Sequence, residues 1–153
     1  AAVAVWRAGD DGRLTLLALA ESEAATRIHM AVGQRQPAGA GATGRALLAS
    51  QNVREQALRT AFTAIRWPGR IDADQYVEQV QTARQTGYAL DLQWLNLGIE
   101  TVAAAIGDAA GRVRYCLSAS MFAGRHDEAQ WAAIGTMMVA AATAIRRKEE
   151  GRE

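Results

Sequence analysis

The sequence predicts an α+β fold with a central antiparallel sheet flanked by helices, and three observations support this. Short segments of alternating apolar and polar residues open the chain, helical patterns fill its middle, and a second hairpin precedes a long final helix. Strands joined by tight turns pair antiparallel, and separate runs of strands and helices are typical of α+β domains. The expected order is three strands, two helices, two strands and one helix, within a single domain over residues 1–153.

The first three strands are expected at residues 2–6, 13–21 and 26–33. The sequence Ala-Gly-Asp-Asp-Gly at positions 8–12 is a strong turn signal between the first two. In the third segment, Ile28, Met30 and Val32 alternate and would lie on one face. These segments predict the first half of the sheet.

The middle of the chain reads as a glycine-rich loop followed by helices. Residues 33–44 form the loop, and helical patterns follow at 45–50 and 53–62. A further helix begins at Asp72, which forms a capping box with Gln75, and stops at Gly87. Its buried stripe would be Tyr76, Val80 and Ala83. Residues 88–91 would then lie in a loop just past the helix end.

A second hairpin and a last helix complete the expected fold. The hairpin strands are expected at 101–107 and 112–120, with a turn at 108–111. The helix begins at Asp127, again with a glutamine, Gln130, three residues later. Its apolar stripe would contain Trp131, Ile134, Met138, Ala141 and Ile145.

Composition excludes several classes of protein. The net charge of +1 with scattered basic residues gives no sign of a nucleic-acid surface. A single cysteine excludes an internal disulfide framework and fits a reducing compartment. The one long uncharged run, residues 129–145, is too short and too weakly apolar to span a membrane, and the opening residues do not resemble a signal peptide. We therefore expect a cytoplasmic protein with no membrane partner.

The last hairpin offers the first candidate site. Side chains alternate along a strand, so Arg114, Cys116, Ser118 and Ser120 share one face and leave two hydroxyls about 7 Å apart. Small side chains on the partner strand leave space beside them, which is typical of a small-ligand pocket. The pattern alone leaves a second interpretation open, and favours it: the serines simply face solvent.

The glycine-rich loop offers the second candidate. Ala42, Thr43 and Gly44 lie near a helix N-terminus, where free N–H groups and the helix dipole attract anions. The loop is not a P-loop, and its G-x-G-x-x-G spacing lacks the parallel βαβ context of a dinucleotide fold. A carboxylate site is the better functional interpretation, and a bare turn is the simpler structural one.

Catalytic and metal chemistry find little support. Cys116 has no local base, the histidines His29 and His126 are far from it in sequence, and no G-x-S-x-G elbow surrounds the serines. Two histidines and one cysteine show no metal-ligand spacing. We expect neither an enzyme nor a bound metal or cofactor.

Three segments together resemble the effector-binding domain of IclR-type transcriptional regulators, the isocitrate lyase regulator family. "VGQRQPAGAGATGRALLAS" is similar to that family's Val-Gly-x-x-x-Pro segment ending in Gly-Lys/Arg-Ala-x-Leu-Ala. "ARQTGYALD" resembles Arg-x-x-Gly-Tyr/Phe-Ala-x-Asp, and "GIETVAAAIGDAAGRVRYCLSAS" resembles the family's last hairpin. Their order and spacing make the resemblance strong.

The resemblance implies a fold, partners and a site. The fold would be GAF-like, the chain would associate with itself as a dimer or tetramer, and operator DNA would be bound only through a winged helix-turn-helix domain that this chain lacks. A small carboxylate effector would be held by backbone groups at Ala42, Thr43 and Gly44, with Asp91 as an acceptor at the pocket floor. The remaining lining would come from Ile99, Thr101, Ser118 and Ser120, with Trp94 and Cys116 at the rim.

The chain departs from the family pattern at several positions. Leu92, Gln93 and Trp94 stand where many members have acids, Ala105 replaces a usual proline, and Thr101 replaces the cysteine of some keto-acid sensors. A less acidic and more aromatic rim suggests a larger or aromatic effector. Two alternatives stay open: a GAF-like nucleotide or redox sensor that uses Cys116, and a small enzyme that uses Asp91.

Overall fold

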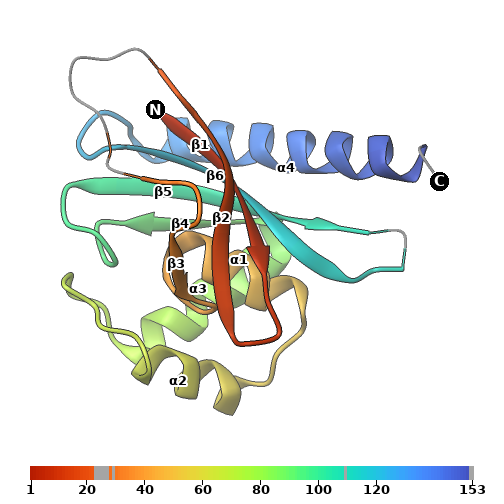
Figure 1. Ribbon diagram of the computed structural model, residues 1–153. Coiled ribbons are helices and arrows are strands. Elements are labelled where there is room, and N and C mark those ends of the chain that lie inside the picture. The colour runs from red at the N-terminus through yellow and green to blue at the C-terminus, as the bar shows by residue number, and fades with distance from the viewer. Residues whose placement is uncertain (23–27, 29, 109, 152–153) are drawn as a thin grey trace.

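The computed structural model describes residues 1–22, 28, 30–108 and 110–151, which form six strands and four helices (Figure 1). In chain order these elements are β1 (Ala2–Ala8), β2 (Arg13–Glu21), β3 (Arg35–Pro37), α1 (Gly41–Ser50), α2 (Glu55–Thr63), α3 (Ala73–Thr86), β4 (Tyr88–Leu92), β5 (Ile99–Gly107), β6 (Val113–Phe122) and α4 (Glu128–Glu150). The predicted α+β class is confirmed.

The strands form one antiparallel sheet in the order β3-β2-β1-β6-β5-β4. The central pair, β1 and β6, joins the first hairpin to the last and places Ala4 opposite Ser118. On the other side of β6, Thr101 of β5 lies opposite Ser120, and Asp91 of β4 lies opposite Thr101. The register thus brings three polar residues from distant parts of the chain into one row across the sheet.

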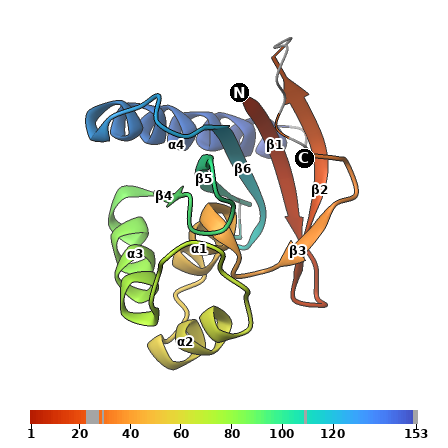
Figure 2. The same ribbon diagram turned by 90° about the vertical axis from the view of Figure 1, so that its left-hand side faces the viewer.

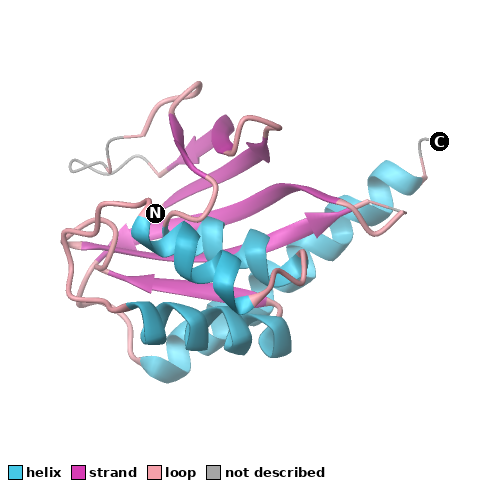
Figure 3. Ribbon diagram, turned by 90° about the horizontal axis from the view of Figure 1, so that it is seen from below, coloured by secondary structure: helices cyan, strands magenta, loops and turns pink. Residues whose placement is uncertain are grey.

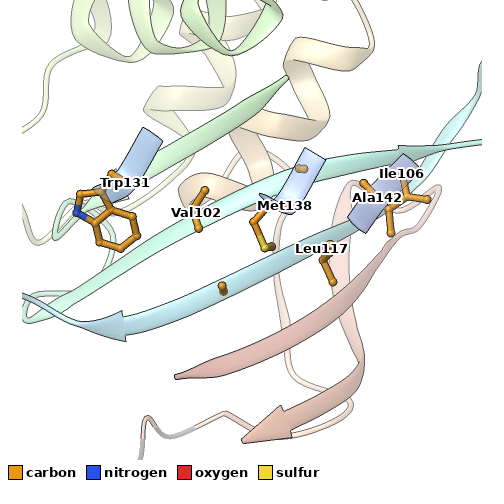
Figure 4. Packing of buried hydrophobic residues seen from close by; sticks show 8 residues of the cluster. Val102, Ile106, Leu117, Trp131, Met138 and Ala142 are labelled. Atoms are coloured by element: carbon orange, nitrogen blue, oxygen red, sulfur yellow. The ribbon is translucent and has the colours of Figure 1, made fainter. Parts of the chain in front are cut away.

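Helices cover both faces of the sheet (Figures 2 and 3). On one face, Trp131, Met138 and Ala142 of α4 pack with Val102, Ile106 and Leu117 (Figure 4). On the other face, Ala42 and Ala46 of α1 pack against Ala103, and α3 lies beside α1. The alternating side chains of β5 and β6 therefore divide between two cores, so the strand face that carries Ser118 and Ser120 is buried rather than exposed to solvent.

Both predicted capping boxes are present. Asp72 accepts a hydrogen bond from the Gln75 amide, and Asp127 accepts one from the Gln130 amide, each with the reciprocal glutamine bond. Gly87 ends α3 in the left-handed conformation, with φ 87°. The stripe of α3 is buried as expected. In α4, the predicted stripe residue Ala141 is exposed, and its neighbour Ala142 is buried instead.

Two strand predictions were wrong. Of the expected strand at 26–33, residues 26, 27 and 29 lie outside the described residues, and the described ones are not in a strand; β3 instead begins at Arg35, where a loop was expected. Residues 88–91, expected as loop, belong to the edge strand β4 (Tyr88–Leu92). Ala89 and Asp91 alternate as the buried residues of β4, which is a strand pattern. The pattern is hard to recognise in the sequence because one of the two buried residues is charged.

Within the described residues, none of the helices has the length and apolar character needed to cross a bilayer.

Candidate ligand-binding site

A cavity of about 540 Å³ lies between the sheet, the N-terminus of α1 and the segment that joins β4 to β5. Its walls combine large apolar side chains with neutral polar ones. The apolar lining is Trp6, Ile28, Met30, Pro68, Leu95, Leu97, Ile99 and Phe122. The polar and small lining is Gln34, Gln36, Gly41, Ala42, Thr43, Asp91, Asn96, Thr101, Ser118 and Ser120. This composition is typical of a small-molecule site.

The N-terminus of α1 supplies backbone donors to this cavity. The first hydrogen bond of the helix runs from the Gly44 N–H to the Ala40 carbonyl, at 2.9 Å, so the N–H groups of Gly41, Ala42 and Thr43 precede the helical ladder. Ala40 caps the helix without a side-chain hydrogen bond. Amides that bond no described residue and the positive end of the helix dipole favour an anion here.

Gly44 has a different part in the same structure. It is outside the cavity lining, and its amide serves the helix. A Cβ atom at this position would lie 2.1 Å from the carbonyl carbon of Gly39, so the loop before α1 crosses the helix where only glycine leaves room. Gly44 shapes the loop that presents the neighbouring amides.

Hydroxyl groups form the sheet wall of the cavity. Ser118, only 1% exposed, accepts a hydrogen bond from the indole Nε1 of Trp6 at 3.0 Å. The hydroxyls of Thr101 and Ser120 are 2.9 Å apart and share one hydrogen bond. Because a hydroxyl group can both donate and accept, each retains capacity for a ligand.

Gln36 provides a polar group opposite α1. Its side-chain Nε2 donates to the hydroxyl of Thr43 at 2.8 Å. Its position in β3 therefore ties the edge of the sheet to the first turn of α1.

Asp91 is 3% exposed, and both of its oxygens already have partners. Its Oδ2 accepts from the Arg45 guanidinium at 2.7 Å, and its Oδ1 accepts from the amides of Trp94 and Leu95 at 3.0 and 3.1 Å. The carboxylate thus fixes the turn after β4 as well as lining the cavity, and a ligand hydroxyl would meet only its remaining lone pairs.

Arg45 lies behind Asp91, fully buried and outside the cavity lining. It also donates to the carbonyl of Leu90 at 2.9 Å. Its guanidinium carbon is 5.5 to 5.6 Å from the ring centres of Trp67, Tyr76 and Trp94, which we call the aromatic cage. Two guanidinium nitrogens, Nε and one terminal NH, make no hydrogen bond to any described residue. The ring faces are their electrostatic partners.

The predicted site residues divide between cavity and surroundings. Those that line the cavity are Ala42, Thr43, Asp91, Ile99, Thr101, Ser118 and Ser120, whereas Gly44, Trp94 and Cys116 lie outside it. Trp94 belongs to the aromatic cage and to a separate groove between α3 and α4. Cys116 lies beneath α1, where its thiol contacts the Thr43 carbonyl at 3.7 Å, and burial raises its pKa to about 12.

Several lining residues were missed from sequence. Trp6 reaches the cavity only because β1 pairs with β6, a register no local pattern encodes. Gln34 and Gln36 were assigned to an unstructured loop, and Asn96 to no element. Arg45, outside the lining, was also missed. Its place at the Lys/Arg position of the family motif was the one signal of a role, but its partner Asp91 is 46 residues away in the sequence.

Among the described residues, no group of three or more His, Cys, Asp or Glu side chains is arranged to hold a metal ion. Asp91 alone among the described lining residues carries a formal charge. Any anion bound there would therefore rely on backbone amides and neutral donors.

Comparison with known proteins shows where this architecture occurs. The structure resembles that of an IclR transcriptional regulator from Alicyclobacillus acidocaldarius, with 25% identity, a TM-score of 0.75, and coverage of 94% of this chain and 60% of that one. It also resembles the Agobacterium tumefaciens repressor BlcR, with 22% identity, a TM-score of 0.81, and coverage of 96% and 59%. The chain thus spans about three fifths of these longer proteins.

A third similar structure is an inducer-binding domain. It belongs to a double mutant of the PobR transcription factor from Acinetobacter in complex with 3-hydroxybenzoic acid, with 19% identity, a TM-score of 0.75, and coverage of 95% and 87%. Among curated proteins, no sequence matches the chain.

The family model described as "Bacterial transcriptional regulator IclR C-terminal" matches residues 7–147, which is most of the sequence. The predicted resemblance is confirmed: the chain belongs to the IclR family of bacterial transcriptional regulators and corresponds to their C-terminal, effector-binding domain.

Proposed function

We propose that the cavity binds a small carboxylated metabolite with an aromatic or similarly bulky apolar body. The observation that carries this proposal is the meeting of unused α1 amides with a wall of buried hydroxyls. The carboxylate would sit at Gly41 to Thr43, where the helix N-terminus favours an anion. The apolar body would pack among Trp6, Leu95 and Phe122.

The ligand class has support from the cavity size and from one structural neighbour. A volume of about 540 Å³ is ample for a substituted benzoate. The PobR domain of the same fold holds 3-hydroxybenzoic acid. In the complete regulator, effector binding would shift oligomeric assembly and operator binding through an N-terminal DNA-binding domain, provided that the ligand favours one state over another.

Calorimetric titration tests the ligand class. We expect 3-hydroxybenzoate to bind in the cavity and the much smaller acids glyoxylate and pyruvate to bind more weakly, because they leave the apolar walls uncovered. Binding of glyoxylate or pyruvate with no response to aromatic acids would contradict an aromatic effector.

Serine variants test the location. Ser118→Ala and Ser120→Ala should each weaken 3-hydroxybenzoate binding by roughly fivefold to tenfold, about 1 kcal/mol, because each removes a hydroxyl from the cavity wall. Ser50→Ala is the matched control, since this serine lies at the other end of α1 and bonds only the Leu47 carbonyl among described contacts. Equal affinities for all three variants and the wild type would place the ligand elsewhere.

The redox alternative finds less support. A redox-sensing cysteine needs an accessible, readily ionised thiol, whereas Cys116 is fully buried with its pKa raised to about 12 by burial. The proteins that the chain resembles are transcriptional regulators, which does not favour an enzyme. Recovery of an unaltered ligand after prolonged incubation would support sensing over turnover.

A further inference from the structure

Asp91 poses an electrostatic problem for a cavity that receives an anion. It is the single formal charge on the described lining, it is negative, and it is almost completely buried. Two like charges repel strongly where water is excluded. An uncompensated Asp91 would therefore oppose the ligand that the amides of α1 attract.

Arg45 supplies the compensating charge from outside the cavity. Its terminal nitrogen is 2.7 Å from the Asp91 Oδ2, and it has no solvent exposure. Because Arg45 lies outside the cavity lining, it compensates the negative charge of Asp91 without occupying space in the cavity or contacting the ligand. The cavity then presents a nearly neutral wall and the positive end of the α1 dipole.

The aromatic cage fixes Arg45 in this position. Three ring faces surround the guanidinium, and a planar guanidinium stacks on such faces better than an ammonium group does. Two residues of the aromatic cage also contact segments next to the cavity. The Tyr76 hydroxyl donates to the carbonyl of Gly39, just before α1, at 2.8 Å, while Trp94 adjoins the turn capped by Asp91.

We propose that Arg45 is a positioning residue that neutralises Asp91 from outside the cavity and so preserves the preference for anionic over neutral ligands that the α1 amides give. This inference rests on the carboxylate site of the proposed function. The preference itself comes from the α1 amides, and the arginine that preserves it lies outside the cavity lining.

A charge-matched pair of probes tests the inference. The affinities of 3-hydroxybenzoate and the neutral 3-hydroxybenzamide are measured for wild type, Arg45→Met and the double variant Arg45→Met/Asp91→Asn. Arg45→Met should lose acid affinity on the order of tenfold more than amide affinity. The double variant, which removes both charges, should recover the preference for the acid. Equal losses for acid and amide in Arg45→Met, or no recovery in the double variant, would overturn the electrostatic role.

Arg45→Lys guards against a variant that fails to fold. It retains the charge but loses the planar fork, so both probes should bind more weakly while the preference for the acid persists. Loss of that preference in a folded Arg45→Lys protein would contradict the role of charge.

Hydrogen exchange in the ligand-free protein separates this inference from the ligand proposal. Without Arg45, the Asp91 carboxylate loses one anchor, so the amides of Trp94 and Leu95 should exchange faster while those of β5 and β6 keep their protection. If wild type binds neither probe, the proposed ligand fails, yet faster exchange at these amides still supports positioning by Arg45. Unchanged exchange would overturn it.

Discussion

At the scale of single residues, the site depends on backbone approach as much as on side chains. Gly44 allows the loop before α1 to pass close to the helix, and the first residues of α1, which follow this loop, line the cavity. The motif predicts a direct ligand contact for Gly44, whereas in the structure its amide bonds the Ala40 carbonyl and the residue lies outside the cavity lining. Local pattern cannot distinguish a glycine that binds from one that permits close packing, because both need a missing side chain.

Gly44→Ala should therefore destabilise the domain. The added Cβ would lie 2.1 Å from Gly39, so the loop must move, and we expect a loss of about 1–3 kcal/mol in the free energy of unfolding. Urea denaturation measures it. Gly107→Ala is the control, since its Cβ would meet its nearest neighbour at 3.8 Å. A Gly44→Ala protein as stable as this control would show that the crossing is readily relaxed.

At the scale of secondary-structure elements, prediction succeeded where a segment carries its own signals. The capping boxes of α3 and α4 and the left-handed Gly87 are local features: both helices begin at their predicted caps, and α3 ends at its predicted glycine. It failed at β3 and β4. β3 has only three residues. β4 carries Asp91, whose burial depends on the ion pair with Arg45 of α1. Pairing across the sheet, rather than local pattern, forms these strands.

The contact between α4 and β4 offers a test at the same scale. Gly135 of α4 lies against Tyr88, so that a Cβ at position 135 would come within 2.5 Å of the ring. Gly135→Ala should cost about 1–2 kcal/mol by forcing the ring aside. The change should be much less costly in a Tyr88→Ala background, because the clash is then absent. Thermal unfolding of both single variants and the double variant measures this coupling, and additive effects would contradict the contact.

At the scale of the whole molecule, one sheet separates two environments. The α4 face is an apolar core, while the α1 face holds a cavity with hydroxyls, amides and one ion pair beside it. Sequence alternation in the last hairpin predicted the two sets of side chains. It could not show that both faces are buried, because that depends on α1 and α4, which are far apart in the sequence, packing on the same strands.

Global stability should fall at alkaline pH. Burial raises the pKa of Cys116 from 9.0 to about 12 and that of Tyr76 from 10.0 to about 12, so the folded state keeps protons that the unfolded chain releases. Raising the pH toward 12 therefore favours unfolding, from about pH 9 for Cys116 and from about pH 10 for Tyr76, by up to about 1.4 kcal/mol per pH unit for each group. The free energy of unfolding, obtained from denaturation curves at several pH values in this range, should fall less steeply with pH for Cys116→Ala than for the wild type. An identical slope would show that the thiol does not contribute.

The hydrogen bond from Trp6 to Ser118 also has a spectroscopic consequence. Of the four tryptophans, Trp6 alone lines the cavity, whereas Trp67 and Trp94 stack on Arg45 and Trp131 of α4 packs on the opposite face of the sheet. The wavelength of indole fluorescence depends on local polarity, so a ligand that displaces water beside Trp6 would shift the emission maximum of this residue. The molecule thus carries an optical reporter in the wall of its cavity, with Trp131 across the sheet as an internal reference.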